Sequence, residues 1–389
     1  MTGKDIKIGL LWHSASAGNL GVGALTLGNM AIVRGVCAEL GLTPRFTIIG
    51  MRDGMDRYVP PEEAPQFVVD TRAVVDPRRA FRTLNAQDVV LDIGSGDSFT
   101  DIYGAKRFAF LWSTKMLTIL GGTPLLLSPQ TIGPFSRQPQ SMLAGWAMTH
   151  AEAVITRDEP SVEATAKLAP KARCAMATDV AFAMPFQDRG AERGGETPRV
   201  GLNVSGLLLH EATVGTNRFG LEVDYAALNH GLMEGFRAKG VQVCLFTHAR
   251  GFSADDDDGR AADQFAERYP WAERVPDFAG PMEVKSFLSS LDFVVSARMH
   301  ACIGALSSGT PVAPIAYSRK FRGLFDLIGY PWRIEVRGRS TEAAVAYVLD
   351  AFDRRAELAA DGEAAMQKVD SYLEVYREAL RALFRKVTA

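Results

Sequence analysis

The sequence predicts an α/β fold of two Rossmann-like domains, and three observations support this prediction. Short apolar segments alternate with longer segments of helical periodicity, which is the pattern of βαβ units and parallel sheets. The length of 389 residues is too great for one ordinary hydrophobic core and suits two domains. The third observation is an internal repetition. A strand beginning at Asp88, a polar loop, a helix and a Gly-Thr-Pro turn at Gly122 are followed later by the same series from Asp292 to Gly309. We therefore expect two similar domains that face each other across a cleft.

The expected strands are short and almost wholly apolar, as strands buried on both faces of a parallel sheet are. In chain order they span 6–12, 45–49, 89–93, 124–128, 153–156, 199–204, 242–246, 293–295 and 312–316. Helical periodicity is clearest over 23–40, 105–120, 225–239 and 282–289, and the residues after 339 predict two further helices.

The polar, glycine-rich segment 187–198 marks the expected boundary between the domains. We expect an N-terminal domain over 1–186, a C-terminal domain over 198–335, and C-terminal helices over 340–389 that pack back on the domains. The basic amphipathic run 376–386 fits a surface helix packed on the protein. A membrane-facing helix is the less favoured alternative.

Composition excludes several classes of protein. A net charge of -2 gives no basic field of the kind that attracts nucleic acid, so no nucleic-acid partner is expected. The four cysteines are far apart and form no C-x-x-C pair, which removes zinc and redox motifs and suggests a reducing compartment. No signal peptide or membrane-spanning run is expected. We therefore predict a cytoplasmic protein, with peripheral contact at the inner face of the membrane left open.

Polar residues follow the expected strands at their carboxyl ends, where open α/β sheets bind ligands. In the first half they are His13, Asp97, Gln130 and Arg157, and in the second half His210, His248, Arg298, His300, Arg319 and Lys320. The permanent cations among them, Arg157, Arg298, Arg319 and Lys320, predict an anion-binding cleft.

The segment from Arg298 through Met299 to His300 is the sharpest candidate, because it opens an expected helix over 299–308. A helix N-terminus offers free backbone N–H groups and the positive end of a dipole. The arginine fork matches a phosphate or a carboxylate, and a histidine can move a proton near neutral pH. We predict that this segment binds an anion. A capped helix start with a structural salt bridge is the alternative.

A glycine-rich loop containing Gly18, Asn19 and Gly21 follows the first expected strand, and its glycines allow a close approach of backbone to a ligand. It is not a dinucleotide fingerprint, because Thr26 occupies the third glycine position, and it lacks the lysine of a P-loop. A tight strand–helix turn is the structural alternative.

A second glycine-rich loop contains Gly94, Gly96, Asp97 and Ser98. Because no histidine is near it in the sequence, we expect Asp97 to bind a hydroxyl or act as a general base rather than to hold a metal. Asp92 and Asp101 are expected to cap backbone groups. The acidic run 255–258 is expected to be a solvated loop.

Taken in order, these segments resemble the polysaccharide pyruvyl transferase family. The matching pieces are Gly18-Asn19-x-Gly21, Gly94-Ser95-Gly96-Asp97-Ser98-Phe99-x-Asp101, Pro129-Gln130-Thr131-Ile132-Gly133-Pro134, Arg157-Asp158-x-x-Ser161, Thr178-Asp179-x-Ala181-Phe182, and Ser296-x-Arg298-x-His300 with Gly309-x-Pro311 and Lys320. Ser95 and Pro129 depart from the glycines usual in the family, which leaves the acceptor undefined.

The resemblance implies a fold similar to the two-domain glycosyltransferase-B architecture, phosphoenolpyruvate as donor and a sugar or glycan acceptor. A lipid-linked acceptor is left open, and no cofactor beyond this co-substrate and no metal is expected. His300, Arg298 and Asp97 are the expected catalytic residues, with His300 as acid and Asp97 as base. The expected donor-binding set is Arg157, Lys320, Arg298 and Met299. The expected acceptor or loop set is Gly18, Asn19, Gly21, Gly94, Gly96, Ser98, Gln130 and His248.

Three alternatives remain open. A nucleotide-sugar glycosyltransferase of the same architecture would bind a diphosphate at the helix terminus. A nicotinamide-dependent oxidoreductase would use Asp53 as a ribose partner, but the incomplete glycine pattern disfavours it. A non-catalytic protein would keep the same residues to sense or carry an anion.

Overall fold

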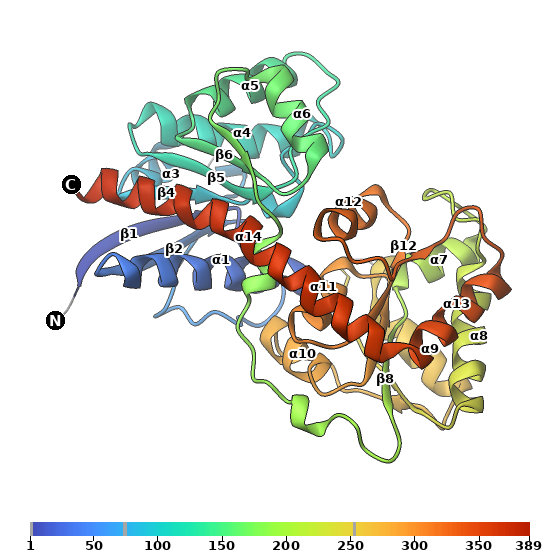
Figure 1. Cartoon of the computed structure of the whole chain (residues 1–389). Coiled ribbons are helices and arrows are strands. Elements are labelled where there is room, and N and C mark those ends of the chain that lie inside the picture. The colour runs from blue at the N-terminus through green and yellow to red at the C-terminus, as the bar shows by residue number, and fades with distance from the viewer. Residues whose placement is uncertain (1–2, 73–75, 252–253) are drawn as a thin grey trace. The chain divides into compact units, whose positions relative to one another are not determined.

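The computed structural model describes residues 3–72, 76–251 and 254–389. The chain forms two compact units, each built on one parallel sheet with helices around it (Figure 1). The first unit comprises Met1–Ala17, Leu25–Met184 and Asp370–Ala389, and the second comprises Gly18–Ala24 and Pro185–Val369. The predicted fold class, two Rossmann-like α/β domains, is confirmed.

The first unit contains a seven-stranded sheet in the order β3-β2-β1-β4-β5-β6-β7. Its strands are β1 (Lys4–Leu11), β2 (Leu42–Gly50), β3 (Gln66–Val68), β4 (Val89–Asp92), β5 (Leu125–Gln130), β6 (Ala153–Thr156) and β7 (Cys174–Met176). Its helices are most of α1 (Leu20–Glu39), α3 (Arg78–Leu84), α4 (Ala105–Leu120), α5 (Gln140–His150), α6 (Glu159–Leu168) and the end of α14 (Arg355–Thr388). Helices α3 to α6 cover one face of the sheet and α1 covers the other (Figure 1).

The second unit contains a six-stranded sheet in the order β10-β9-β8-β11-β12-β13. Its strands are β8 (Arg199–Asn203), β9 (Gln242–Leu245), β10 (Glu273–Arg274), β11 (Phe293–Ser296), β12 (Val312–Ala316) and β13 (Ile334–Glu335). Its helices are α7 (Gly206–Val214), α8 (Tyr225–Ala238), α9 (Asp258–Arg268), α10 (Pro281–Leu288), α11 (Met299–Ser307), α12 (Arg319–Ile328), α13 (Thr341–Asp353) and the start of α14.

The internal repetition corresponds to one βαβ arrangement built twice. Asp88, just before β4, accepts a hydrogen bond at 2.7 Å from the backbone N–H of Lys7 on β1. Asp292, just before β11, accepts one at 2.7 Å from the backbone N–H of Arg199 on β8. Each aspartate thus ties the start of its strand to the neighbouring parallel strand, which explains why both halves carry it.

The first half of the chain differs from the expected domain assignment in one segment. Gly18–Ala24, expected in the N-terminal domain, groups with the second unit. The reason is local hydrogen bonding: Leu20 donates its backbone N–H to His248 at 3.1 Å, and Arg250 donates to Gly18 at 2.9 Å. The chain passes from one unit to the other after Met184, just before the polar segment predicted as the boundary.

The predicted pair of C-terminal helices is present as α13 and α14. The apolar side of 376–386 is buried, with Tyr376, Leu380 and Phe384 fully inaccessible. The Tyr376 hydroxyl donates to Asn29 at 2.8 Å and lies 2.9 Å from the Ser128 hydroxyl, so this part of α14 is tied into the first unit.

Helix α1 is the exception to the expectation that no segment has the length and apolarity to cross a bilayer. Helix α1 is long and apolar enough to cross a bilayer by length and composition alone, although 78% of its most apolar window is buried inside the protein. A buried core helix of a folded domain shows the same pattern.

Candidate functional site

One cluster of candidate site residues lies at the carboxyl edge of the second unit's sheet. Arg298 is the N-cap of α11, which follows β11 directly, so the predicted helix start at Met299 is confirmed. The Ser296 hydroxyl accepts from the backbone N–H of Arg298 at 2.9 Å and donates to Asn203 on β8 at 2.9 Å. The side chain of the N-cap residue Arg298 makes no capping hydrogen bond to the first turn of α11. The turn's N–H groups and its positive dipole end therefore remain suited to an anion.

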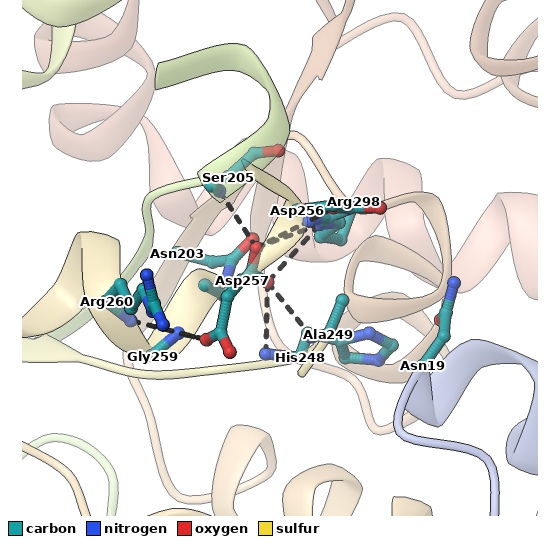
Figure 2. Close-up of polar contacts among 12 residues, drawn as sticks. Asn19, Asn203, Ser205, His248, Ala249, Asp256, Asp257, Gly259, Arg260 and Arg298 are labelled. Carbon is teal, nitrogen blue, oxygen red and sulfur yellow. Dashed lines mark hydrogen bonds and ion pairs between the residues drawn. The ribbon is translucent and has the colours of Figure 1, made fainter. Parts of the chain in front are cut away.

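Asp258 contacts more residues at this edge than any other side chain described here, and Figure 2 labels its partners Arg298, Asn203 and His248. Its carboxylate accepts from Arg298 Nη2 at 2.7 Å and from Asn203 Nδ2 at 3.0 Å. It also accepts hydrogen bonds from the backbone N–H groups of Gly206 at 3.0 Å, His248 at 3.2 Å and Ala249 at 3.0 Å. It thus connects the loops that follow β8, β9 and β11.

The environment of Asp258 keeps it ionised. Burial by itself raises the pKa of this carboxyl, but the Arg298 guanidinium and the donated hydrogen bonds outweigh burial and hold the pKa below its usual value. The side chain is completely buried, so the expectation of a solvated loop is wrong for this residue. The acidic run carries no sequence signal that separates Asp258 from its exposed neighbours.

The charge of Arg298 is already compensated. The guanidinium also pairs with Asp256, and only 11% of the arginine side chain is exposed. Burial lowers the pKa of Arg298, but the two carboxylates outweigh burial and raise it. One positive and two negative charges therefore meet here, and only Nη1 takes no part in these bonds. An incoming anion must compete with Asp256 for the guanidinium.

The loop containing Gly18, Asn19 and Gly21 meets the His300 side chain. A Cβ on Gly21 would lie 2.3 Å from His300 Nδ1, so only glycine allows the imidazole to approach the backbone this closely. Asn19 accepts from the Gly21 N–H at 3.0 Å and forms an antiparallel bridge with Ala249. The structure thus places these loop residues beside the predicted donor-binding segment, which differs from their expected place on the acceptor side.

His248, expected among the acceptor or loop residues, also lies here and is 3% exposed. Burial lowers its pKa to about 3, and the nearby His300 and Arg298 add to this effect. The imidazole is therefore neutral at physiological pH. Its Nδ1 has no hydrogen-bond partner among the residues that the structure describes. In Figure 2 the His248 ring extends toward Asn19.

Lys320 lies exposed in the first turn of α12, after β12 and so at the same sheet edge as Arg298. The side chain of Arg319 falls outside the described part of the structure. His210 lies on α7 with its Nδ1 3.7 Å from the Asp255 carboxylate.

A second cluster of candidate site residues lies at the carboxyl edge of the first unit's sheet, around the loop 94–97. Gln130, the last residue of β5, donates through Nε2 to the Asp92 carbonyl at 2.7 Å. A Cβ on Gly94 would lie 2.1 Å from Gln130 Oε1, and one on Gly96 would lie 2.7 Å from Leu25. Both glycines also have positive φ, +53° at Gly94 and +88° at Gly96. The loop therefore requires glycine at both positions, for the space around the backbone and for its conformation.

Arg157 belongs to this second cluster and not to the surroundings of Arg298. It donates to Asp179 at 2.6 Å and to Thr131 at 3.1 Å, and its side chain is 7% exposed. Its Nη1 would be 3.5 Å from a Cβ on Gly96. The predicted donor-binding arginines are thus divided between the two units. Asp179, which the sequence offered only as part of a motif, neutralises Arg157.

The aspartates of the loop have distinct environments. Asp92 is fully buried, pairs with Lys115 at 2.7 Å and accepts from the Gly94 N–H at 2.7 Å. Asp101 accepts the backbone N–H groups of Ser136 and Arg137 at 2.6 and 2.8 Å, so the capping roles expected of Asp92 and Asp101 are confirmed.

Asp97 is half-buried and accepts a hydrogen bond from the Tyr103 hydroxyl at 3.2 Å. Ser98 is buried and accepts from Arg107 at 2.7 Å. Tyr103 and Arg107 were not among the predicted site residues, because a single aromatic residue and a helix-borne arginine carry no spacing signal. Over residues 3–72, 76–251 and 254–389 there is no group of three His, Cys, Asp or Glu side chains arranged for a metal.

Comparison with known proteins shows the family to which the chain belongs. The sequence profile of the family described as polysaccharide pyruvyl transferase matches residues 27–319, which include Asp97, Arg157, Arg298 and His300. The amylovoran biosynthesis protein AmsJ of Erwinia amylovora is 20% identical over 268 residues. That match spans 64% of this chain and 61% of AmsJ, less than two thirds of the relative's length.

Solved structures share the fold at low sequence identity. HepE from Anabaena, in complex with UDP and glucose, is 13% identical with a TM-score of 0.57, covering 96% of this chain and 99% of HepE. A glycosyltransferase from Rickettsia africae is 10% identical with a TM-score of 0.58, covering 98% and 99%. These likenesses establish a glycosyltransferase-B-like fold. The family profile covers most of the chain, so the chain belongs to the polysaccharide pyruvyl transferase family.

Proposed function

We propose that the chain transfers the enolpyruvyl group of phosphoenolpyruvate to two hydroxyls of one sugar, forming a pyruvate ketal and releasing phosphate. The observation that carries the proposal is the Arg298–His300 segment at the uncapped start of α11, with His300 seated against Gly21. This arrangement offers anion-binding N–H groups and a proton carrier within one helical turn.

The donor carries a carboxylate and a phosphate, so it needs compensating positive charge. The first turn of α11 supplies N–H groups, Arg298 supplies Nη1, and Lys320 supplies an exposed ammonium at the same sheet edge. Because Asp256 holds Nη2, binding of the donor releases Arg298 from that carboxylate in this proposal. Asp258 stays in place and keeps the guanidinium oriented.

The chemistry then proceeds in two bond-forming steps. His300 donates a proton to the methylene carbon of phosphoenolpyruvate, which becomes a methyl group, and positive charge develops on the adjacent carbon. One acceptor hydroxyl forms a C–O bond to that carbon, with Asp97 as the proposed acceptor of its proton. The second hydroxyl displaces phosphate as the C–O bond to phosphate breaks. The two hydroxyl protons restore His300 and protonate the phosphate. The acid step supplies roughly 10²–10⁴-fold.

Incubation of the full chain with phosphoenolpyruvate and a panel of glycan acceptors tests the proposal, with mass spectrometry for the pyruvyl ketal and an assay for free phosphate. His300→Ala should lose roughly 10²-fold or more of turnover. His150→Ala is the matched control, because His150 is an exposed histidine on α5. Near-wild-type turnover by His300→Ala would exclude the acid role.

The same incubation separates the alternatives. A nucleotide-sugar glycosyltransferase would release a nucleotide from a sugar nucleotide and leave phosphoenolpyruvate intact. A non-catalytic protein would be stabilised thermally by phosphoenolpyruvate without forming any product with any acceptor.

A further inference from the structure

A rigid loop beside Asp97 holds two apolar side chains out in solvent. This loop, residues 98–104, runs from the glycine-rich segment to α4, and its Ile102 and Tyr103 are 61% and 48% exposed. Exposed large apolar side chains that lie together, next to polar groups, are a usual mark of a binding surface.

The exposure is not a result of a loose chain. Gly133 donates its N–H to the Phe99 carbonyl at 2.8 Å, and the Thr100 hydroxyl donates to the Pro134 carbonyl at 2.7 Å. Asp101 accepts two further N–H groups from the segment after Pro134. The residues on either side of Ile102 and Tyr103 are therefore fixed to the neighbouring segment, which holds the two side chains outward.

The orientation of the Tyr103 ring is fixed from two directions. Its hydroxyl donates to Asp97 at 3.2 Å, and the Arg107 guanidinium lies 5.7 Å from the ring centroid. Arg107 is itself bonded to the Ser98 hydroxyl at 2.7 Å. A cation against an aromatic ring at this distance is attractive. The ring is thus presented in one orientation at the rim of the glycine-rich loop.

We propose that Tyr103, with Ile102, is the surface on which the acceptor sugar ring rests while one of its hydroxyls reaches Asp97. This rests on the proposed function, in which the acceptor is a sugar. A pyranose has an apolar C–H face and a polar hydroxyl edge, so an exposed apolar surface beside a carboxylate matches both sides of it. A patch of two side chains is too small for a stable protein interface.

In this proposal Tyr103 is also a positioning residue for Asp97. Its hydroxyl hydrogen bond holds the Asp97 carboxylate in one position. Loss of the hydroxyl alone should therefore lower kcat without changing how tightly the sugar is held. Loss of the whole ring should weaken sugar binding.

The first experiment measures sugar binding without phosphoenolpyruvate, so that its outcome does not depend on the ketal chemistry. Saturation-transfer NMR with a panel of methyl hexopyranosides is compared for the wild-type chain and for variants. Tyr103→Ala should weaken binding about three- to tenfold, Ile102→Ala should weaken it less, and Tyr103→Phe should bind as the wild type does. Leu120→Ala is the control, because Leu120 is 66% exposed at the far end of α4.

The second experiment uses an acceptor that the chain pyruvylates. Tyr103→Phe should keep the KM for that acceptor and lower kcat, because Asp97 is then no longer held by the hydroxyl. Tyr103→Ala should raise that KM and leave the KM for phosphoenolpyruvate unchanged. Equal sugar binding by the wild type and Tyr103→Ala, or no binding of any hexopyranoside by the wild type, would overturn the proposal. Failure of ketal formation with normal sugar binding would instead refute the proposed function.

Discussion

Replacing Asp258 by asparagine removes the charge that holds Arg298 while keeping the shape of the side chain. In the native protein this carboxylate pairs with Arg298 at 2.7 Å and accepts hydrogen bonds from Asn203 and from three backbone N–H groups. Its side chain is completely buried, so water cannot replace the lost charge. The loops after β8, β9 and β11 would lose their common partner.

The magnitude follows from the buried ion pair. Removing one member of a buried pair costs about 3–5 kcal/mol, because the other charge stays buried without compensation. Asp256 still faces Arg298, and asparagine keeps one oxygen for the backbone N–H groups, so the lower end applies. We expect Asp258→Asn to lower the free energy of unfolding of the second unit by about 3 kcal/mol.

The pH dependence has a definite sign. The pKa of Asp258 lies below its usual value in the folded protein, although burial acts to raise it, because the Arg298 charge and the hydrogen bonds prevail. Its stabilising contribution is fully present above the unfolded-state pKa of about 3.9 and is lost as the pH falls through the lower folded-state pKa. The difference in stability between wild type and Asp258→Asn should therefore be constant near neutral pH and shrink below about pH 4.

Urea unfolding followed by circular dichroism, at several pH values, measures both effects. Asp257→Asn is the matched control: it removes the same charge one residue earlier, but Asp257 only caps α9 through Gly259 and Arg260 (Figure 2). Asparagine caps as well as aspartate, so this control should change stability by less than about 0.5 kcal/mol. Equal, small effects of the two substitutions would refute the role of Asp258.

Three further predictions concern Asp256, Gly21 and Ser95. Asp256→Asn removes one of the two negative charges beside Arg298. Because water screens this partly exposed pair, the gain should be about 1 kcal/mol, and phosphoenolpyruvate should bind about fivefold more tightly in calorimetry. Weaker binding would contradict the competition between Asp256 and the donor. Gly21→Ala places a Cβ 2.3 Å from His300 Nδ1 and should lower kcat roughly 10²-fold. Gly35→Ala is the control and should leave kcat unchanged, because its Cβ meets nothing within 4 Å. Equal kcat values for the two variants would show that turnover does not depend on the position of the His300 ring. Ser95 has a φ of 50°, so Ser95→Gly should be tolerated and Ser95→Val should lower the free energy of unfolding by about 1–2 kcal/mol; a valine variant as stable as the wild type would contradict strain at this position.

The long elements of the fold were predictable because their periodicity is strong. Helix α4 and strands β6 and β12 occur with the predicted bounds, and α11 begins at the predicted residue. The strands that sequence reasoning missed are β3, β7, β10 and β13, each of two or three residues. Segments this short show no alternation, and they form because a neighbouring strand offers hydrogen bonds.

The site was predictable only in its individual motifs. Arg298, His300, Asp97 and Gln130 lie at strand ends as expected, since parallel strands place their carboxyl ends on one edge of a sheet. Which motifs meet could not be read from the sequence. Gly21 and His300 are far apart in the sequence, and tertiary folding brings them into contact.

The burial of charges was likewise hidden in the sequence. Asp258 lies in a run of four aspartates and is fully buried, whereas Asp255 in the same run is 61% exposed. Arg157 and Arg298 look equivalent as cations after strands, but Arg157 pairs with one carboxylate of its own unit and Arg298 with two carboxylates of its own unit. Sequence reasoning found the cations and missed their counter-ions.

The central claim is that His300 delivers a proton to the methylene carbon of phosphoenolpyruvate during transfer. The most direct test is to run the reaction in deuterium oxide, with phosphoenolpyruvate and an acceptor that the chain pyruvylates, and to examine the transferred group by mass spectrometry. Protonation from the exchangeable His300 site predicts a single deuterium in the methyl group of each new ketal, and strong loss of product with His300→Ala. A ketal methyl group without deuterium, or full product formation by His300→Ala, would contradict the claim.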